Sequence, residues 1–264
     1  MTRERTWTTC RLMLVPPRSG AENMARDVAL MERARHSGEM VFSVYEWKRP
    51  TLSFGRNQKA LGSYSPTELE KRGIDVVRRP TGGRALLHHR EVTYSVTAAI
   101  EENESLRESY ARINRILLQG LLRMGVAVRE SVRDSPSLRP GDTPCFAAPA
   151  EGELVTRDGK LVGSAQVREN GALLQHGSIL IEDDQTLIAE LLGATTGEIL
   201  PTSAATLSSV LGRSPPVAEV ADNLFTAVRE LECATASPLP ESEVSGAVSR
   251  HIDRFESEWW TWRT

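Results

Sequence analysis

Cys145 and Lys160 are the two residues whose types and spacing best suit nucleophilic chemistry. Cys145 lies within residues 132–151, a stretch that holds four of the fourteen prolines and has neither a helical nor a strand period. A lone cysteine is more often a buried small hydrophobe than a nucleophile, but such a stretch offers little core to bury one. Lys160 follows fifteen residues later. An exposed lysine at a strand end is the default interpretation; if it faces a cleft beside Cys145, its ammonium group lowers the pKa of the thiol.

A pair of glycines among arginines is the second candidate, in residues 78–84 (Arg-Arg-Pro-Thr-Gly-Gly-Arg). Adjacent glycines allow positive φ and a close approach of the backbone to a ligand, while the arginines supply charge. A plain hairpin turn between two strands explains Gly82 and Gly83 as well. Single polar residues beside other glycine-containing turns are more typical of packing or turn roles: Asn57, His88, Gln166 and His176. Cys10 and Cys233 have no such context, and we predict that both are structural.

The elements that must position these residues follow from apolar spacing and from turn residues. Ser19 and Glu22 form a predicted capping box at the start of one helix, and Gly125 is a predicted stop for another. The predicted helices cover residues 20–37, 66–72, 106–124, 217–232 and 241–260. The predicted strands cover residues 41–47, 51–55, 75–79, 84–87, 92–97, 126–128, 153–156, 160–167 and 173–182.

Helices and strands do not alternate regularly, which excludes a doubly wound parallel fold. We therefore predict one α/β (α+β) domain over residues 1–264, with a mixed, largely antiparallel sheet of about seven strands flanked by helices. A length of 264 residues, with 40% hydrophobic and 25% charged residues, is ordinary for a soluble globular protein. The start, Met-Thr-Arg-Glu-Arg, precedes no apolar segment, and no stretch reaches the roughly 18 apolar residues of a membrane span. Three scattered cysteines indicate no disulfide framework, so we expect a cytoplasmic protein.

The charge is unevenly distributed although the net charge is only −3. Residues 48–90 hold ten Lys or Arg against three acidic residues, a local charge of +7. This segment is either a solvated basic face or a surface for an anionic group, such as a phosphate-bearing cofactor arm or an acidic carrier protein. A sequence pI of about 6.0 argues against a nucleic-acid partner.

Five blocks occur together along the chain: residues 55–58 (Gly-Arg-Asn-Gln), 78–88 (Arg-Arg-Pro-Thr-Gly-Gly-Arg-Ala-Leu-Leu-His), 144–146 (Pro-Cys-Phe), 159–166 (Gly-Lys-Leu-Val-Gly-Ser-Ala-Gln) and 175–178 (Gln-His-Gly-Ser). In this order they resemble the biotin/lipoate ligase–octanoyltransferase superfamily, over roughly residues 23–192. Within it, the chain is most similar to the cysteine-dependent octanoyltransferases, which move octanoate from acyl carrier protein onto a lysine of a lipoyl domain.

The resemblance implies a catalytic region similar to that of the class II synthetases, over about residues 23–235, with a C-terminal helical extension at 236–264. Cys145 would be the acyl-thioester nucleophile. Lys160 would lower its pKa, orient the thioester carbonyl and relay a proton. The implied substrate-binding residues are Arg79, Gly82, Gly83, Arg84, His88, Gly163, Ser164 and Ala165. The family pattern places an acidic residue directly after His88, where this chain has His89.

We expect a monomer as the default state, without a metal or a cofactor. The donor would be octanoyl acyl carrier protein. The acceptor would be a lipoyl-domain protein such as glycine cleavage H protein or a 2-oxoacid dehydrogenase E2, with no nucleic acid and no membrane involved. Three alternatives stay open. An ATP-dependent lipoate or octanoate ligase would share the glycine loop and the lysine, but is not expected to have a nucleophile at Cys145. An amidotransferase would take octanoate from another lipoyl domain, and a non-enzymatic module would only bind carrier or lipoyl domains.

Overall fold

Two β-sheets organise the chain in the computed structural model, which describes residues 7–100, 104–131, 152–192 and 204–263. The strand order of the eight-stranded sheet is β11 (Ser237–Pro238), β1 (Cys10–Arg18), β2 (Met40–Trp47), β6 (Glu91–Ala99), β10 (Ala172–Leu180), β9 (Gly159–Glu169), β8 (Leu154–Thr156) and β7 (Arg129–Glu130). A three-stranded sheet has the order β4 (Asp75–Arg78), β3 (Thr51–Phe54) and β5 (Leu86–His88). Only β1 with its two neighbours and β3 with β4 pair in parallel among the strands of the described residues. The predicted mixed, largely antiparallel fold is therefore confirmed.

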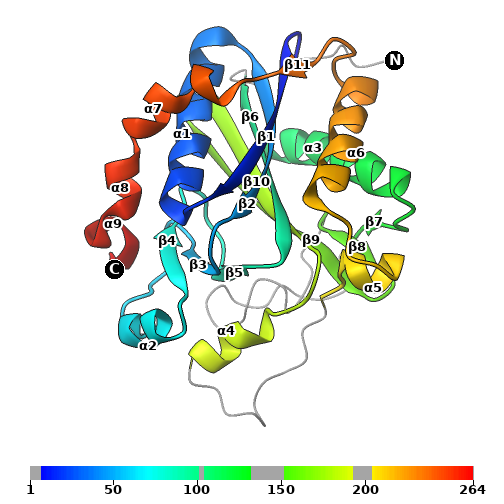
Figure 1. Ribbon diagram of the computed structural model, residues 1–264. Coiled ribbons are helices and arrows are strands. Elements are labelled where there is room, and N and C mark those ends of the chain that lie inside the picture. The colour runs from blue at the N-terminus through cyan, green and yellow to red at the C-terminus, as the bar shows by residue number, and fades with distance from the viewer. Residues whose placement is uncertain (1–6, 101–103, 132–151, 193–203, 264) are drawn as a thin grey trace.

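Helices cover both faces of the large sheet (Figure 1). On one face lies α1 (Gly20–Ser37), and on the other α3 (Leu106–Arg123) and α6 (Val217–Leu231) pack side by side. Successive side chains of a strand point to opposite faces. On β2, accordingly, Phe42 enters the core beneath α3 and α6, while Tyr45 packs in the cluster that holds Leu30 of α1.

Short helices complete the described structure: α2 (Pro66–Lys71), α4 (Thr186–Leu191), α5 (Leu207–Leu211), α7 (Ser245–Ser249), α8 (Ile252–Glu256) and α9 (Glu258–Trp262). The predicted caps are present where they decide helix ends. Ser19 and Glu22 form a reciprocal capping box, and Gly125 has φ of +84°. The amide of Val126 donates to the carbonyl of Leu121 after that glycine. This bond closes the helix end, and the predicted strand at 126–128 is therefore wrong; a two-residue strand follows at 129–130 instead.

Three further features differ from the sequence predictions. The first is β1, which has no predicted counterpart, because its parallel partners β2 and β11 are separated from it in the sequence, and Pro16 and Pro17 near its end resemble a loop. The single predicted sheet is two sheets, since β3, β4 and β5 pair only with one another among the described strands. The predicted helix over 241–260 is a 3₁₀ turn (Glu241–Glu243) followed by α7, α8 and α9. These short pieces bury Val244 against Leu30 and Phe255 against Met24, in two separate clusters.

Candidate active site

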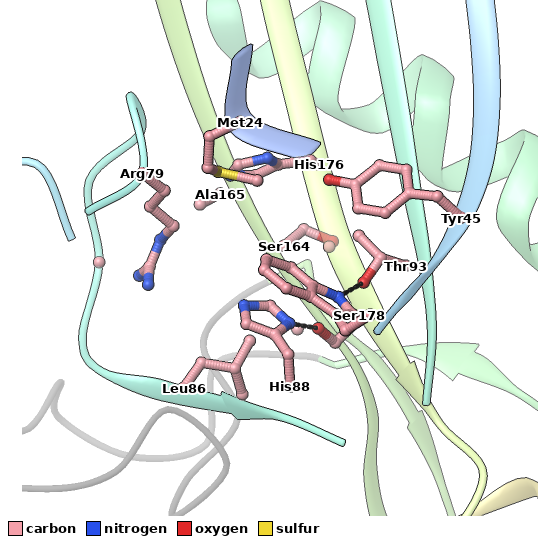
Figure 2. Close-up of a pocket in the computed structure, with 14 residues that line it drawn as sticks. Met24, Tyr45, Arg79, Leu86, His88, Thr93, Ser164, Ala165, His176 and Ser178 are labelled. Carbon is pink, nitrogen blue, oxygen red and sulfur yellow. Dashed lines mark hydrogen bonds between the residues drawn. The ribbon is translucent and has the colours of Figure 1, made fainter. Parts of the chain in front are cut away.

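A pocket lies where the α1 face of the large sheet meets the small sheet (Figure 2). Figure 2 shows Arg79 on one side, Met24 of α1 on another, and Leu86 and His88 of β5 below. Apolar walls with a few polar groups are typical of small-molecule sites. The lining residues come from seven parts of the chain: Met24, Tyr45, Trp47, Arg79, Gly83, Leu86, His88, Thr93, Gly163, Ser164, Ala165, His176, Gly177 and Ser178.

Most of the substrate-binding residues implied by the sequence blocks line this pocket, namely Arg79, Gly83, His88, Gly163, Ser164 and Ala165. Gly82 and Arg84 belong to the same loop but are not among the lining residues, and neither is Lys160. Cys145 lies outside the described residues. Met24, Tyr45, Trp47 and Thr93 have no chemical signal in the sequence; only the pairing of β2 with β6 brings three of them together.

The loop between β4 and β5 holds the glycine pair, and it is not a hairpin turn. β4 and β5 lie on opposite sides of β3, so the alternative of a plain hairpin is wrong. Gly83 has φ of +100°, a conformation that favours glycine. A Cβ atom on Gly55 would lie 2.0 Å from the carbonyl oxygen of Gly83. The two backbones therefore touch, and this contact places Gly83 in the pocket wall.

The side chain of Arg79 fixes the same loop by hydrogen bonds to its carbonyl groups. Its guanidinium donates to the carbonyl and the hydroxyl of Ser53, at 3.0 and 2.9 Å, and to the carbonyl of Gly82 at 3.0 Å. It also donates to the carbonyl of Arg84 at 2.7 Å. Arg79 is buried. A positively charged side chain with these partners shapes the loop and presents part of its surface to the pocket.

The imidazole of His88 is fixed in place by hydrogen bonds and by ring stacking. Its Nδ1 lies 2.7 Å from Oε1 of Glu91, its Nε2 lies 2.8 Å from the Ser53 hydroxyl, and its ring stacks on Trp47 with centroids 3.9 Å apart. Burial lowers the pKa of His88, with Glu91 opposing the effect. The imidazole is therefore neutral near pH 7, and it donates from Nδ1 to the carboxylate. The acidic partner stands three residues after His88, on β6, rather than directly after it.

The stacked rings of His88 and Trp47 are also joined by hydrogen bonds. Trp47 Nε1 donates to the Thr93 hydroxyl at 2.7 Å, and that hydroxyl donates to Oε1 of Glu91 at 2.6 Å. The same Glu91 oxygen accepts from His88. This closed ring of contacts makes a rigid pocket wall from three strands.

His176, a second histidine in the pocket wall, is part of a buried polar chain. Its Nδ1 lies 2.7 Å from Oδ2 of Asp27, and its Nε2 lies 2.7 Å from the hydroxyl of Thr81. Tyr45 donates to the same Asp27 oxygen at 3.1 Å. Burial, followed by the charge of Asp27, raises the pKa of Tyr45 well above its ordinary value. These hydrogen bonds connect Asp27 of α1, through His176 of β10, to Thr81, which directly precedes Gly82.

Lys160 is buried, with 1% of its side chain exposed, and its Nζ lies 2.7 Å from Oε1 of Glu153. The default interpretation of an exposed strand-end lysine is therefore wrong. The predicted hairpin of β8 and β9 brings Glu153 and Lys160 together, because Val155 pairs with Lys160 across it. Three residues further along β9, Gly163 reaches the pocket wall. Sequence spacing alone carries no signal for Glu153.

Cys10 and Cys233 are both buried. Burial raises the pKa of the Cys10 thiol, with the neighbouring Cys233 adding to the effect. The Cys233 thiol donates to the carbonyl of Thr8 at 3.7 Å. Cys10 is thus held in the thiol form, which is a poor nucleophile, as expected for a structural residue.

Four of the ten basic residues in the segment at 48–90 are in ion pairs. Arg49, Arg56, Arg72 and Arg90 form ion pairs with Asp75, Glu169, Glu68 and Glu182, respectively. Lys48, Lys59 and Lys71 are exposed, and within the described ranges no acidic residue lies within ion-pair distance of them. The described residues contain no group of three or more His, Cys, Asp or Glu placed to hold a metal ion. None of the helices in the described part is long and apolar enough to cross a membrane.

The family described as the lipoyl protein ligase A/B catalytic domain matches residues 19–229. The chain belongs to this family. Its sequence relatives include octanoyltransferase LipM of Carboxydothermus hydrogenoformans, 44% identical over 170 residues that cover 63% of this chain and 62% of the relative. LipM of Kyrpidia tusciae is 41% identical, covering 71% of this chain and 70% of the relative. LipM of an Exiguobacterium species is 34% identical over 98% of this chain and 99% of the relative.

Solved structures of lipoate-protein ligases share the fold. Lipoate-protein ligase A bound with ATP superposes with a TM-score of 0.77 at 18% identity, over 97% of this chain and 99% of that one. The bi-partite lipoate protein ligase of Thermoplasma acidophilum gives 0.72 at 18% identity, over 97% and 96%. At these identities the likeness shows the fold alone. The superfamily and the fold predicted from the sequence blocks are thus confirmed for this member of the lipoyl protein ligase family.

Proposed function

We propose that this protein transfers an octanoyl group to a lysine of a lipoyl domain, in protein lipoylation, through a thioester on Cys145. The observation that carries the proposal is the 34% sequence identity with octanoyltransferase LipM of an Exiguobacterium species, which covers 98% of the chain. Relatives with this name make the protein an acyltransferase. The pocket supports the acyl substrate, because the side chains of Met24, Trp47 and Leu86 give it apolar walls.

In the first half-reaction, the Cys145 thiolate attacks the carbonyl carbon of octanoyl acyl carrier protein. A new carbon–sulfur bond forms, the donor carbon–sulfur bond breaks, and the carrier thiolate leaves and takes a proton. One thioester replaces another, so the step is close to isoenergetic and needs no ATP. Covalent catalysis of this kind divides a transfer between two bulky proteins into two steps.

In the second half-reaction, the neutral amine of the acceptor lysine attacks the octanoyl-Cys145 carbonyl. The amide bond forms, the carbon–sulfur bond breaks, the thiolate of Cys145 is restored, and the amine gives up one proton. We assign Lys160 to stabilising the thiolate, orienting the carbonyl and relaying this proton. Its ion pair with Glu153 fixes the position of Nζ at 2.7 Å from the carboxylate.

The acyl chain would lie along the pocket, between the glycine loop and β9 and β10. Burial of an apolar chain contributes about 0.8 kcal/mol per CH₂, so an eight-carbon chain gains several kcal/mol and shorter chains bind less well. The lining residues assigned to this substrate site are Arg79, Gly83, His88, Gly163, Ser164 and Ala165. Gly82 and Arg84 are assigned to it as members of the glycine loop. We further propose a cytoplasmic monomer without metal or cofactor, a single domain with its catalytic region at about 23–235, and H protein or an E2 lipoyl domain as acceptor.

The test is intact mass spectrometry of the protein mixed with octanoyl acyl carrier protein, without ATP or acceptor. We expect a gain of one octanoyl group that hydroxylamine removes and that Cys145→Ala lacks. Cys10→Ala and Cys233→Ala are matched controls and should gain the group as wild type does. Wild-type acylation in Cys145→Ala would refute the thioester on Cys145. No gain from the carrier, combined with a bound adenylate from octanoate and ATP, would indicate a ligase. A gain only from an octanoylated lipoyl domain would indicate an amidotransferase.

A further inference from the structure

Arg78 of β4 joins two backbone segments that are remote in the sequence. Its side chain is fully buried, and the hydrogen bonds it makes within the described residues all go to carbonyl oxygens. Nη1 donates to Gly55 and Gln58 at 2.7 Å each. Nε donates to Trp260 and Thr261 at 3.0 Å each, and Nη2 donates to Arg263 at 3.0 Å.

A cation in this setting is costly unless its N–H groups are all satisfied. Burial, together with the nearby Arg263, lowers the pKa of Arg78. Within the described ranges no carboxylate forms an ion pair with its guanidinium. Five donors in a rigid fork suit two separate rows of carbonyl groups, and a lysine could not reach both. The geometry thus points to a connecting role for Arg78 rather than contact with a substrate.

Side chains of the C-terminal residues also donate hydrogen bonds to Arg78 and to the segment that Arg78 binds. Trp260 Nε1 donates to the carbonyl of Arg78 at 2.8 Å, and Arg263 Nη2 donates to the carbonyl of Arg56 at 2.6 Å. Trp260 is 5% exposed and packs in a cluster with Met24, a residue of the pocket wall. Figure 1 shows α7 and α8 lying along α1, and α9 beyond them beside β4.

Residues 55–58, which Arg78 holds, contact the glycine loop directly. The Gly55 and Gly83 backbones touch, with a Cβ on Gly55 lying 2.0 Å from the Gly83 oxygen. The amide of Arg56 donates to the carbonyl of Thr81 at 2.7 Å. A displacement of residues 55–58 therefore moves Gly83, and Gly83 lines the pocket.

We infer that residues 260–263, together with Arg78, form a C-terminal clamp that positions the glycine loop and thereby sets the affinity of the pocket for its acyl donor. These C-terminal residues lie beyond the family match, which ends at residue 229. Arg78 and Trp260 are positioning residues, since neither lines the pocket. The kinetic part of the test rests on the proposed octanoyl transfer.

The test uses Trp260→Phe, which keeps an aromatic ring but removes the donor to Arg78. Trp259→Phe is the matched control, because Trp259 stands on the same short helix with 77% of the residue exposed. Loss of one hydrogen bond that positions the loop should raise the KM for octanoyl acyl carrier protein about two- to tenfold, with kcat little changed. Arg78→Lys should raise it further, and Trp259→Phe should leave it at the wild-type value.

A second measurement is independent of activity: hydrogen exchange of residues 55–58 and 80–84, followed by mass spectrometry. Exchange should be faster in Trp260→Phe than in wild type and unchanged in Trp259→Phe. Equal exchange and equal KM in the two tryptophan variants would overturn the clamp. So would a fall in kcat alone, in proportion to the folded fraction, because that is a purely structural effect. If wild type forms no acyl-enzyme, the proposed function fails while the exchange result still decides the clamp.

Discussion

Gly55→Ala is the substitution whose effect the structure defines most directly. The added Cβ would lie 2.0 Å from the carbonyl oxygen of Gly83, and real Cβ contacts essentially never fall below 3.0 Å. The two backbone segments must therefore separate by about 1 Å, because both atoms belong to rigid parts of the main chain. Gly83 is in the pocket wall, so the separation changes the shape of the site.

Two magnitudes follow. Overpacking at a tight contact costs about 1–3 kcal/mol of the free energy of unfolding. A misplacement of about 1 Å at a reacting centre can lower the rate about 100-fold. We therefore expect Gly55→Ala to fold with reduced stability and to lose about 100-fold in kcat/KM for octanoyl transfer, a loss larger than the stability change alone would cause.

The assay compares urea unfolding and steady-state transfer in Gly55→Ala with two control variants. At Gly246 in α7, nothing lies within 4 Å of the position that a Cβ would take, so Gly246→Ala should keep wild-type activity. A Cβ on Gly82 would also meet open space, so Gly82→Ala should keep wild-type stability while reporting on its own assigned role in substrate binding. Wild-type kcat/KM and wild-type unfolding in Gly55→Ala would refute the argument, since the loop would then be free to relax without moving the pocket wall.

Two other predictions concern buried charges. Lys160→Met or Glu153→Gln should each lower the free energy of unfolding by about 3–5 kcal/mol, because each leaves a buried charge without this partner. In urea unfolding, the double variant should be more stable than the sum of the two losses by more than about 0.5 kcal/mol, and a smaller coupling would show that the pair is not tight. Burial holds the pKa of His88 below 6.5, so the unfolded chain takes up a proton there more readily than the folded chain. The contribution of His88 to stability is therefore present above pH 6.5 and lost as the pH falls; between about pH 7 and about pH 5, wild type should lose more unfolding free energy than His88→Gln, and equal losses would contradict this account.

The local elements and the family can be predicted from the sequence, because they depend on interactions between residues that are close together in the chain. The capping box of Ser19 and Glu22 and the hairpin turn at Arg157 and Asp158 depend on residues a few positions apart. The blocks around Gly82 and Lys160 carry the resemblance to the family. Six of the fourteen residues that line the pocket can therefore be named from the sequence without their arrangement.

The arrangement itself depends on strand order and register, which no short stretch encodes. β1 escapes prediction because parallel pairing gives it no adjacent partner in the sequence. Glu91 as the partner of His88, Glu153 as the partner of Lys160 and Trp260 as the partner of Arg78 all require distances that follow only from the sheets and from the path of the C-terminal helices.

The capped helices α1 and α3, the hairpin of β8 and β9, the family, and the residue types available for acyl transfer can thus be inferred from the order of amino acids alone, since each depends on interactions within a few residues or on a local block. The shared pocket of the glycine loop, β9 and β10, the burial of Lys160 against a carboxylate, and the hold of the C-terminus on the loop exist only in the folded chain. These contacts join elements that come together only when the sheets assemble, and their closure is stabilised by the whole core rather than by local preference.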